Sequence, residues 1–245
     1  MINRVQFRSL TAALALGASM ATLARGAEAP PCDIQRWEAA IAKFEKQDAN
    51  DPPPKDAVLF VGSSSIVGWD VAKGFPDLPV VNRGFGGSNF CQAAHFVPRI
   101  VVKYQPRVIV LYSGDNDVAA GKSAEQVHAD FAAFVAAVRK SLPETPIVVI
   151  SIKPSIARWK LRETMQAVNQ LIAADCKEKD HLYFIDVWPT MLGEDDLPRK
   201  EIFRDDGLHM NDEGYKRWVD VVRPTLDELL KKANHDDTTS TTEGK

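Results

Sequence analysis

The chain has 245 residues, of which 45% are hydrophobic and 26% are charged, and its formal net charge is −3. This length and composition predict one globular domain with a sizeable hydrophobic core. The slight excess of acidic residues gives no electrostatic reason to expect nucleic acid or an anionic membrane as a partner.

The first 29 residues differ from the rest of the chain. Arg4 and Arg8 precede an uncharged run at 9–24 that is rich in alanine and leucine, and small residues follow as far as Ala29. This pattern is typical of a secretory signal peptide, and the run is shorter than the about 20 apolar residues that span a bilayer. We therefore expect a signal peptide at 1–29, a secreted or periplasmic mature chain, and no stable membrane insertion.

The chain has three cysteines, Cys32, Cys91 and Cys176, and export would affect whether they form a disulfide. They lie far apart in the sequence, unlike the closely spaced cysteines of a zinc site. In an oxidising compartment we expect one disulfide and one buried thiol, and the sequence does not choose the pair. Three buried thiols are the alternative.

Short apolar runs alternate with amphipathic patterns through the mature chain. A helix is expected between Asp33 and the prolines after Asp51, and further helices are expected after Ser123, ahead of the last strand and after Asn211. The expected strands cover 58–61, 79–82, 107–112, 146–151 and 182–186. Buried strands that alternate with helices predict an α/β fold: a three-layer α/β/α arrangement with a doubly wound, parallel, five-stranded, flavodoxin-like sheet. We expect one domain at 30–233 and a disordered polar tail at 234–245.

Polar or glycine-rich clusters follow the first three expected strands. They are Gly62-Ser63-Ser64, then Gly84-Phe85-Gly86-Gly87-Ser88, then Gly114-Asp115-Asn116-Asp117. Because the carboxyl ends of parallel strands meet at one edge of a sheet, these clusters are expected to converge on one crevice. A fourth cluster, Asp205-Asp206-Gly207-Leu208-His209, precedes the last helix.

Together the four clusters hold the groups that acyl transfer requires. The reaction needs a nucleophile, a base, a group that orients the base, and hydrogen-bond donors for the oxyanion. A serine lies in the first cluster, a backbone N–H at Gly87 in the second, an amide at Asn116 in the third, and Asp206 with His209 in the fourth. Each cluster alone could be a turn, a loop cap or a surface pair. Their order on four separate elements favours a single site.

With these four blocks the sequence resembles the SGNH (GDSL-type) hydrolases, and it is most similar to their small acetylhydrolase-like members. The resemblance covers about residues 57–226. It implies the SGNH hydrolase fold, with Ser64 as nucleophile and Asp206 and His209 as the rest of the triad. It also implies an oxyanion hole formed by Gly87, Asn116 and the backbone N–H of Ser64.

One position departs from the family pattern. The family usually has aspartate before the nucleophile, whereas this chain has Ser63 there, and Ser65 follows on the other side. Three hydroxyl groups are therefore adjacent. Counting from Gly62 and from Gly68-Trp69 selects Ser64.

The resemblance implies a serine esterase that hydrolyses carboxylic esters, with short-chain acyl or acetyl groups the expected substrates. No cofactor or metal is implied, and the expected partner is a small-molecule or carbohydrate ester; the oligomeric state stays open. Some further side chains could either shape a pocket or belong to the core or surface: Arg83, Phe85, Tyr112, Lys153 and Trp159.

The sequence also bears on two other classes of function. The glycines of 84–87 could belong to a nucleotide-binding or oxidoreductase domain, but the third glycine of the dinucleotide fingerprint is missing and the loop follows the second strand. A non-catalytic, carbohydrate-binding descendant of the esterase fold is the main alternative. Activity on a chromogenic acetyl ester separates the esterase from both.

Overall fold

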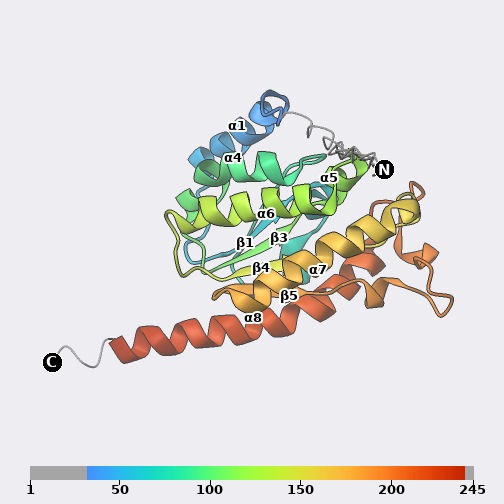
Figure 1. The fold of residues 1–245 in the computed structure, drawn as a ribbon. Helices are drawn as coiled ribbons and strands as arrows, with labels where there is room; N and C mark the ends of the chain where they lie inside the picture. Colours follow the sequence, from blue (N-terminus) through green and yellow to red (C-terminus); the bar gives the residue numbers. More distant parts are fainter. Residues whose placement is uncertain (1–31, 241–245) are drawn as a thin grey trace, which may run out of the picture. The chain divides into compact units, whose positions relative to one another are not determined.

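The computed structural model describes residues 32–240, so the expected signal peptide lies outside the described residues. Its strands are β1 (Val58–Gly62), β2 (Val80–Gly84), β3 (Val108–Tyr112), β4 (Ile147–Ile150) and β5 (Leu182–Ile185). They form a parallel five-stranded sheet in the order β2-β1-β3-β4-β5 (Figure 1). This is the flavodoxin-like strand order, and it confirms the predicted fold class.

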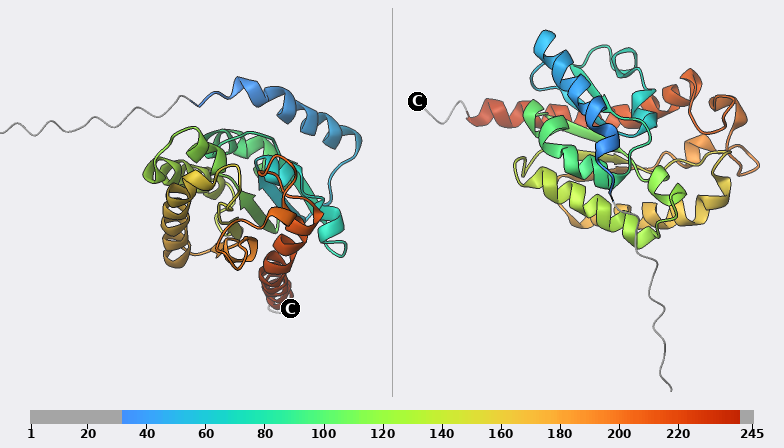
Figure 2. Two further views of the ribbon diagram at one scale, coloured as in Figure 1. Left: turned by 90° about the vertical axis from the view of Figure 1, so that its right-hand side faces the viewer. Right: turned by 90° about the horizontal axis from the view of Figure 1, so that it is seen from above.

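Helices cover both faces of the sheet. One face carries α1 (Gln35–Asn50), α4 (Phe90–Ile100), α6 (Ala124–Arg139) and α7 (Arg162–Glu178), and the other carries α2 (Ser64–Val67), α3 (Val71–Gly74) and α8 (Asp212–Ser240). Short 3₁₀ turns occupy Val102–Tyr104, Trp159–Leu161, Pro189–Met191 and Lys200–Ile202. Figure 2 (left) views the sheet from the side on which α5 (Asp115–Ala119) lies, just after the carboxyl end of β3.

The core has two halves because side chains alternate along each strand. From β1, Leu59 and Val61 pack on one side of the sheet, and Val58 and Phe60 pack on the other. Every residue of β1, β3 and β4 is buried, which explains why these strands are apolar throughout rather than alternating with polar residues. The sheet is therefore the inner layer of a three-layer domain.

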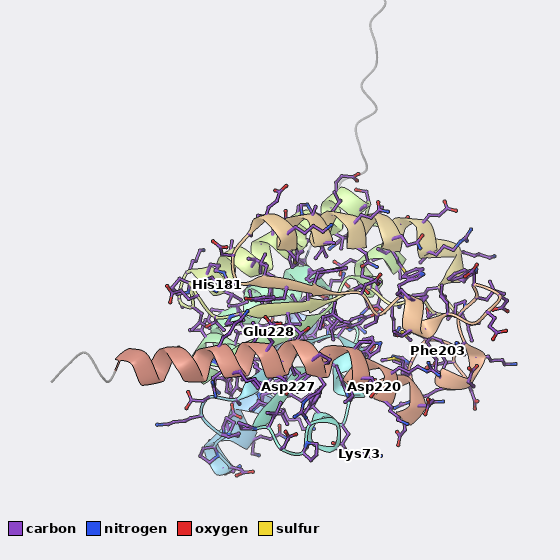
Figure 3. All side chains as sticks on the ribbon, turned by 90° about the horizontal axis from the view of Figure 1, so that it is seen from below. Lys73, His181, Phe203, Asp220, Asp227 and Glu228 are labelled. Atoms are coloured by element: carbon purple, nitrogen blue, oxygen red, sulfur yellow. A yellow bond between two sulfur atoms is a disulfide. The ribbon has the colours of Figure 1, made fainter. Side chains whose placement is uncertain are left out.

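Helix α8 covers the face of the sheet seen in Figure 3, where Asp220, Asp227 and Glu228 are labelled along it. Its fully buried Trp218 packs against Tyr112 of β3, with 4.9 Å between the ring centroids. The helix continues to Ser240, past residue 233, at which the predicted domain ends. Within the part of the chain that the structure describes, neither α8 nor another helix is long and apolar enough to cross a membrane.

Capping signals explain where several helices begin. The expected capping box at Ser123 and Gln126 starts α6, and Asn211 caps α8 by accepting hydrogen bonds from backbone N–H groups of the first turn. Helix α4 was not expected from the sequence. Its signal is a second capping box at Asn89 and Gln92, followed by a helix that tolerates Pro98 in its last turns.

A disulfide joins Cys32 to Cys91, so the residues just before α1 are linked to the first turn of α4. The structure thus supplies the pair that the sequence left open. The third cysteine, Cys176 on α7, is unpaired and partly buried. Burial raises the pKa of its thiol to about 12, which keeps it in the unreactive protonated form.

Removing the disulfide should destabilise the domain. The bridge spans a sequence separation of 59, and closing a loop of that length is expected to contribute at most about 4 kcal/mol to the free energy of unfolding. We expect a Cys32→Ser and Cys91→Ser double variant to unfold at lower urea concentration, with a loss of about 2–4 kcal/mol. Cys176→Ala is the matched control and should change much less. Identical unfolding curves for the wild type with and without reductant would contradict the prediction.

Candidate active site

Ser64 lies at the end of β1, where the chain turns sharply into α2. Gly62 has φ of +148°, and a Cβ there would collide with the carbonyl oxygen of Tyr112 on the neighbouring strand. Only glycine fits this junction. The next residue, Ser63, is fully buried, Ser65 is 2% exposed, and Ser64 is partly exposed. Of the three adjacent serines, Ser64 is the accessible one.

Helix α2 is held in place by side chains of β2 and α8. The amide of Asn82 donates hydrogen bonds to the carbonyl oxygens of Ile66 and Trp69 at 2.7 and 3.1 Å. The hydroxyl of Tyr215 donates to the carbonyl oxygen of Ser65 at 2.9 Å, and burial raises the pKa of this phenol to about 12, so it stays a donor. Sequence reasoning singled out neither role, because both depend on contacts between distant segments.

The fourth cluster forms a closed turn immediately before α8. An antiparallel bridge between Phe203 and Met210 closes it, and the N–H of Arg204 donates to the carbonyl oxygen of His209 at 2.8 Å. Gly207, with φ of +63°, provides the left-handed residue that the turn requires. Phe203, labelled in Figure 3, packs with the core half beneath α8, so the turn is anchored at its base.

Within this turn, Asp206 orients His209. One carboxylate oxygen of Asp206 accepts backbone N–H groups of Leu208 and His209, both at 2.9 Å, and the other lies 2.6 Å from Nδ1 of His209. The hydrogen bond from the His209 side chain, together with these two backbone donors, holds the pKa of Asp206 well below its usual value. Because an ionised carboxylate only accepts hydrogen bonds, Nδ1 must carry a proton.

The opposite ring nitrogen of His209 faces the serine. Its Nε2 lies 3.0 Å from Oγ of Ser64, across 145 positions of sequence. With Nδ1 protonated toward Asp206, Nε2 can accept the hydroxyl proton. The structure therefore brings together Ser64, His209 and Asp206 in the order hydroxyl, imidazole, carboxylate.

The glycine-rich loop after β2 lies beside Ser64. A Cβ placed on Gly86 would be 3.9 Å from Cβ of Ser64, and the carbonyl oxygen of Gly86 accepts a hydrogen bond from the Trp37 indole at 2.9 Å. A Cβ on Gly87 would lie 3.8 Å from Nη2 of Arg36. Helix α1, which carries both Trp37 and Arg36, therefore contacts this loop directly.

Asn116 lies in the first turn of α5, after β3. Its side-chain Nδ2 donates to the carbonyl oxygen of Ser88 at 3.0 Å, and its Oδ1 accepts from Nη2 of Arg158 at 2.9 Å. The loop after β2 and the loop after β3 thus touch, as their places at the same sheet edge predict. Arg158 was not among the residues that sequence reasoning selected.

A buried ion pair fixes the start of α4 to the same edge. The side chain of Asp117 is fully buried; it accepts the backbone N–H of Phe90 at 3.1 Å and pairs with Lys122 at 2.8 Å. Lys122 also reaches the partly exposed Asp130 at 2.6 Å. Burial raises the pKa of Asp117 even though Lys122 opposes this effect. Through its hydrogen bond with the Phe90 N–H, Asp117 connects α5 to the helix that follows the Gly87 loop.

The side chains considered for a substrate pocket have different roles. Phe85, Tyr112 and Lys153 are at most 2% exposed and belong to the interior. Arg83 pairs with Asp48 and lies over the Tyr104 ring. Trp159 lines a surface pocket with the exposed Ile156 and Leu197, and Arg83 lines a different one beside Asp48. Among residues 32–240, no group of three or more histidine, cysteine or acidic side chains is arranged to hold a metal ion.

The sheet order and the loops that carry Ser64, Gly87, Asn116 and His209 define an α/β protein with the SGNH hydrolase architecture. A family model described as the GDSL-like lipase/acylhydrolase family matches residues 60–217. The chain therefore belongs to this family and is a hydrolase, as the sequence resemblance predicted.

Similarities to individual proteins support this family assignment. The chain is 27% identical over 214 residues to a platelet-activating factor acetylhydrolase IB subunit alpha1 of Pongo abelii, covering 82% of this chain and 88% of that protein. It is 28% identical to a GDSL esterase/lipase of Oryza sativa subsp. japonica, covering 76% and 82%. The structure of a GDSL-like lipase from Bacteroides thetaiotaomicron superposes with a TM-score of 0.65 at 17% identity, covering 78% and 98%.

The ion pair at Asp117 should matter more for stability than the pair at Asp130. Asp117→Ala removes a buried partner of Lys122 and leaves the N–H of Phe90 without its acceptor. We expect a loss of about 3 kcal/mol or more in the free energy of unfolding, as for other broken buried pairs. Asp130→Ala is the matched control on the same lysine, and its loss should stay near or below about 1 kcal/mol. Urea unfolding measures both; equal losses would refute the ranking.

Proposed function

We propose that this hydrolase is a serine esterase that cleaves carboxylic esters with short acyl groups, above all acetyl. Ser64 is the nucleophile, His209 the general base, and Asp206 the residue that orients and stabilises the imidazole. The observation that carries the proposal is the pair of contacts at His209: Nε2 to Ser64 Oγ at 3.0 Å and Nδ1 to Asp206 at 2.6 Å.

The reaction follows from these contacts. His209 Nε2 takes the hydroxyl proton as Ser64 Oγ attacks the ester carbonyl carbon, and a tetrahedral intermediate forms. The resulting imidazolium passes this proton to the leaving alkoxide, so the alcohol departs and an acyl-enzyme remains. Water, deprotonated by His209, then attacks the acyl-enzyme, and the carboxylic acid leaves while Ser64 recovers its proton.

The negative charge on the carbonyl oxygen needs preorganised donors. We assign these to the N–H groups of Gly87 and Ser64 and to the amide of Asn116. Two contacts support the assignment: the loop of Gly86 and Gly87 lies against Ser64, and the Asn116 amide is tied to the same loop through Ser88.

The choice of substrate rests on the relatives. One of them is named an acetylhydrolase and another an esterase/lipase. Esters of small molecules or of carbohydrates with an acetyl group are therefore the substrates to test first. No specific contact favours the alternative of a non-catalytic, carbohydrate-binding protein. That alternative predicts that the protein hydrolyses none of these esters.

The nucleophile can be tested directly. Ser64→Ala should abolish hydrolysis of p-nitrophenyl acetate without unfolding the protein, because its hydroxyl forms the acyl-enzyme. Ser63→Ala and Ser65→Ala are matched controls, and both should keep much of the activity. A fluorophosphonate should label Ser64 in the wild type. An adduct on Ser63 or Ser65, or full activity in Ser64→Ala, would disprove the assignment.

We also propose that the protein is exported and that residues 1–29 are a cleaved signal peptide. The charged start and apolar run of that segment support export, and so does the Cys32–Cys91 disulfide, since such bonds persist in oxidising compartments. N-terminal sequencing of the protein from its producing cell should find a mature start between Arg25 and Pro30. An intact Met1 in the cytoplasmic fraction would refute this.

A further inference from the structure

A cluster of charged side chains lies next to Asn116, and the reaction outlined above does not use it. Its members are Asp115, Arg158 and Lys153. Arg158 Nη1 is 2.9 Å from the Asp115 carboxylate, and Lys153 Nζ is 3.9 Å from the same oxygen. The side chains of Asp115 and Lys153 are 4% and 1% exposed, and that of Arg158 is 18% exposed. One carboxylate therefore faces two basic side chains in the interior.

Such a cluster has no evident value for stability. Taking charges out of water costs free energy, and apolar side chains of similar size often serve a core as well or better. Burial lowers the pKa of Lys153 despite the nearby Asp115, so its charged form is held at a cost. Buried charges beside a candidate catalytic group are more often explained by function.

Arg158 determines how the amide of Asn116 is oriented. Its Nη2 contacts Oδ1 of Asn116 at 2.9 Å, while the carbonyl oxygen of Ser88 contacts Nδ2 at 3.0 Å. A guanidinium only donates hydrogen bonds and a carbonyl oxygen only accepts them. The amide can satisfy both neighbours in one orientation alone. The flipped amide would place its NH₂ group against Arg158 and its oxygen against Ser88.

This orientation matters for an oxyanion donor. In the observed orientation one N–H of Asn116 binds Ser88 and the second N–H of the same nitrogen is left for another acceptor. A cation on the amide oxygen also draws electron density from the nitrogen, and hydrogen bonds in a chain strengthen one another in this way. Nη1 of Arg158 lies 2.9 Å from the Asp115 carboxylate, so the guanidinium has an acidic neighbour on one arm and the amide oxygen of Asn116 on the other.

The same segment also touches the turn that holds His209. The backbone N–H of Ala157 donates to the carbonyl oxygen of Gly207 at 3.0 Å. Arg158, the next residue, therefore follows a direct contact with the turn of Asp206 and His209. The two adjacent residues Ala157 and Arg158 therefore contact both the turn that carries the candidate base, His209, and the candidate oxyanion donor, Asn116.

We propose that Arg158 is a positioning residue for the oxyanion hole, which fixes and polarises the Asn116 amide while Asp115 pairs with its guanidinium. The proposal rests on the esterase function proposed above. It assigns to Arg158 an effect on the transition state, where negative charge develops, and none on the binding of the uncharged ester.

The test is a double-mutant cycle on the full mature protein, with p-nitrophenyl acetate as substrate. Asn116→Ala should lower kcat by about 10²–10³-fold, as loss of one such donor does. Arg158→Met should lower kcat by about tenfold or more with KM nearly unchanged, because the interaction strengthens only in the transition state. In the Asn116→Ala background the same change should cost no more than about twofold.

Two further variants sharpen the result. Arg158→Lys keeps a positive charge but cannot contact Asn116 and Asp115 together, so it should restore only part of the lost kcat. Arg223→Met is the matched control, since Arg223 on α8 also bridges carboxylates, at Asp77 and Asp227, and its loss should leave kcat unchanged.

The outcomes separate the two proposals. Equal losses of kcat from Arg158→Met in both backgrounds, with a lowered melting temperature, would mean a purely structural role and overturn the inference. A raised KM in both backgrounds would mean direct substrate binding and overturn it as well. If Ser64→Ala retains activity, the proposed function itself fails, whatever Arg158 does.

Discussion

The structure depends on the register of β1 between its two neighbours. Parallel pairing sets Gly62 level with Gly84 of β2 on one side and with Tyr112 of β3 on the other. Three loops consequently leave the sheet at the same height, and each carries part of the candidate site. A shift of one residue in β1 would turn its side chains to the wrong faces and move Ser64 away from His209.

Around that edge the chain uses polar contacts where the rest of the domain uses apolar packing. Asp117 accepts a backbone N–H at the start of α4, Asn82 and Tyr215 bind carbonyl oxygens of and just after α2, and Asp206 binds His209. Because hydrogen bonds are directional, each of these contacts fixes the relative orientation of two groups more closely than apolar packing would. The interior beneath the site therefore contains charged groups whose burial costs free energy, and directional hydrogen bonds fix its geometry.

Much of this arrangement could be predicted from the sequence, and the exceptions have physical causes. The strands were found because their apolar runs are continuous, and Ser64 was selected because a glycine turn fixes its register. The partner of Cys32, the existence of α4 and the role of Arg158 were not found. Cys32 and Cys91 are brought together only by the packing of α1 on α4, and Arg158 reaches Asn116 across 42 positions of sequence. Local sequence patterns carry no information about such contacts between distant segments.

The separation between Ser64 and His209 also has a consequence for biosynthesis. The turn of residues 203–210 is the penultimate structural element of the described chain, and only α8 follows it. A growing polypeptide that has emerged as far as β5 already contains every strand of the sheet, yet its serine has no imidazole beside it. Under the proposed mechanism, the hydroxyl of Ser64 would therefore gain its base only when this turn docks, and its reactivity toward esters would report completion of the domain rather than formation of its sheet.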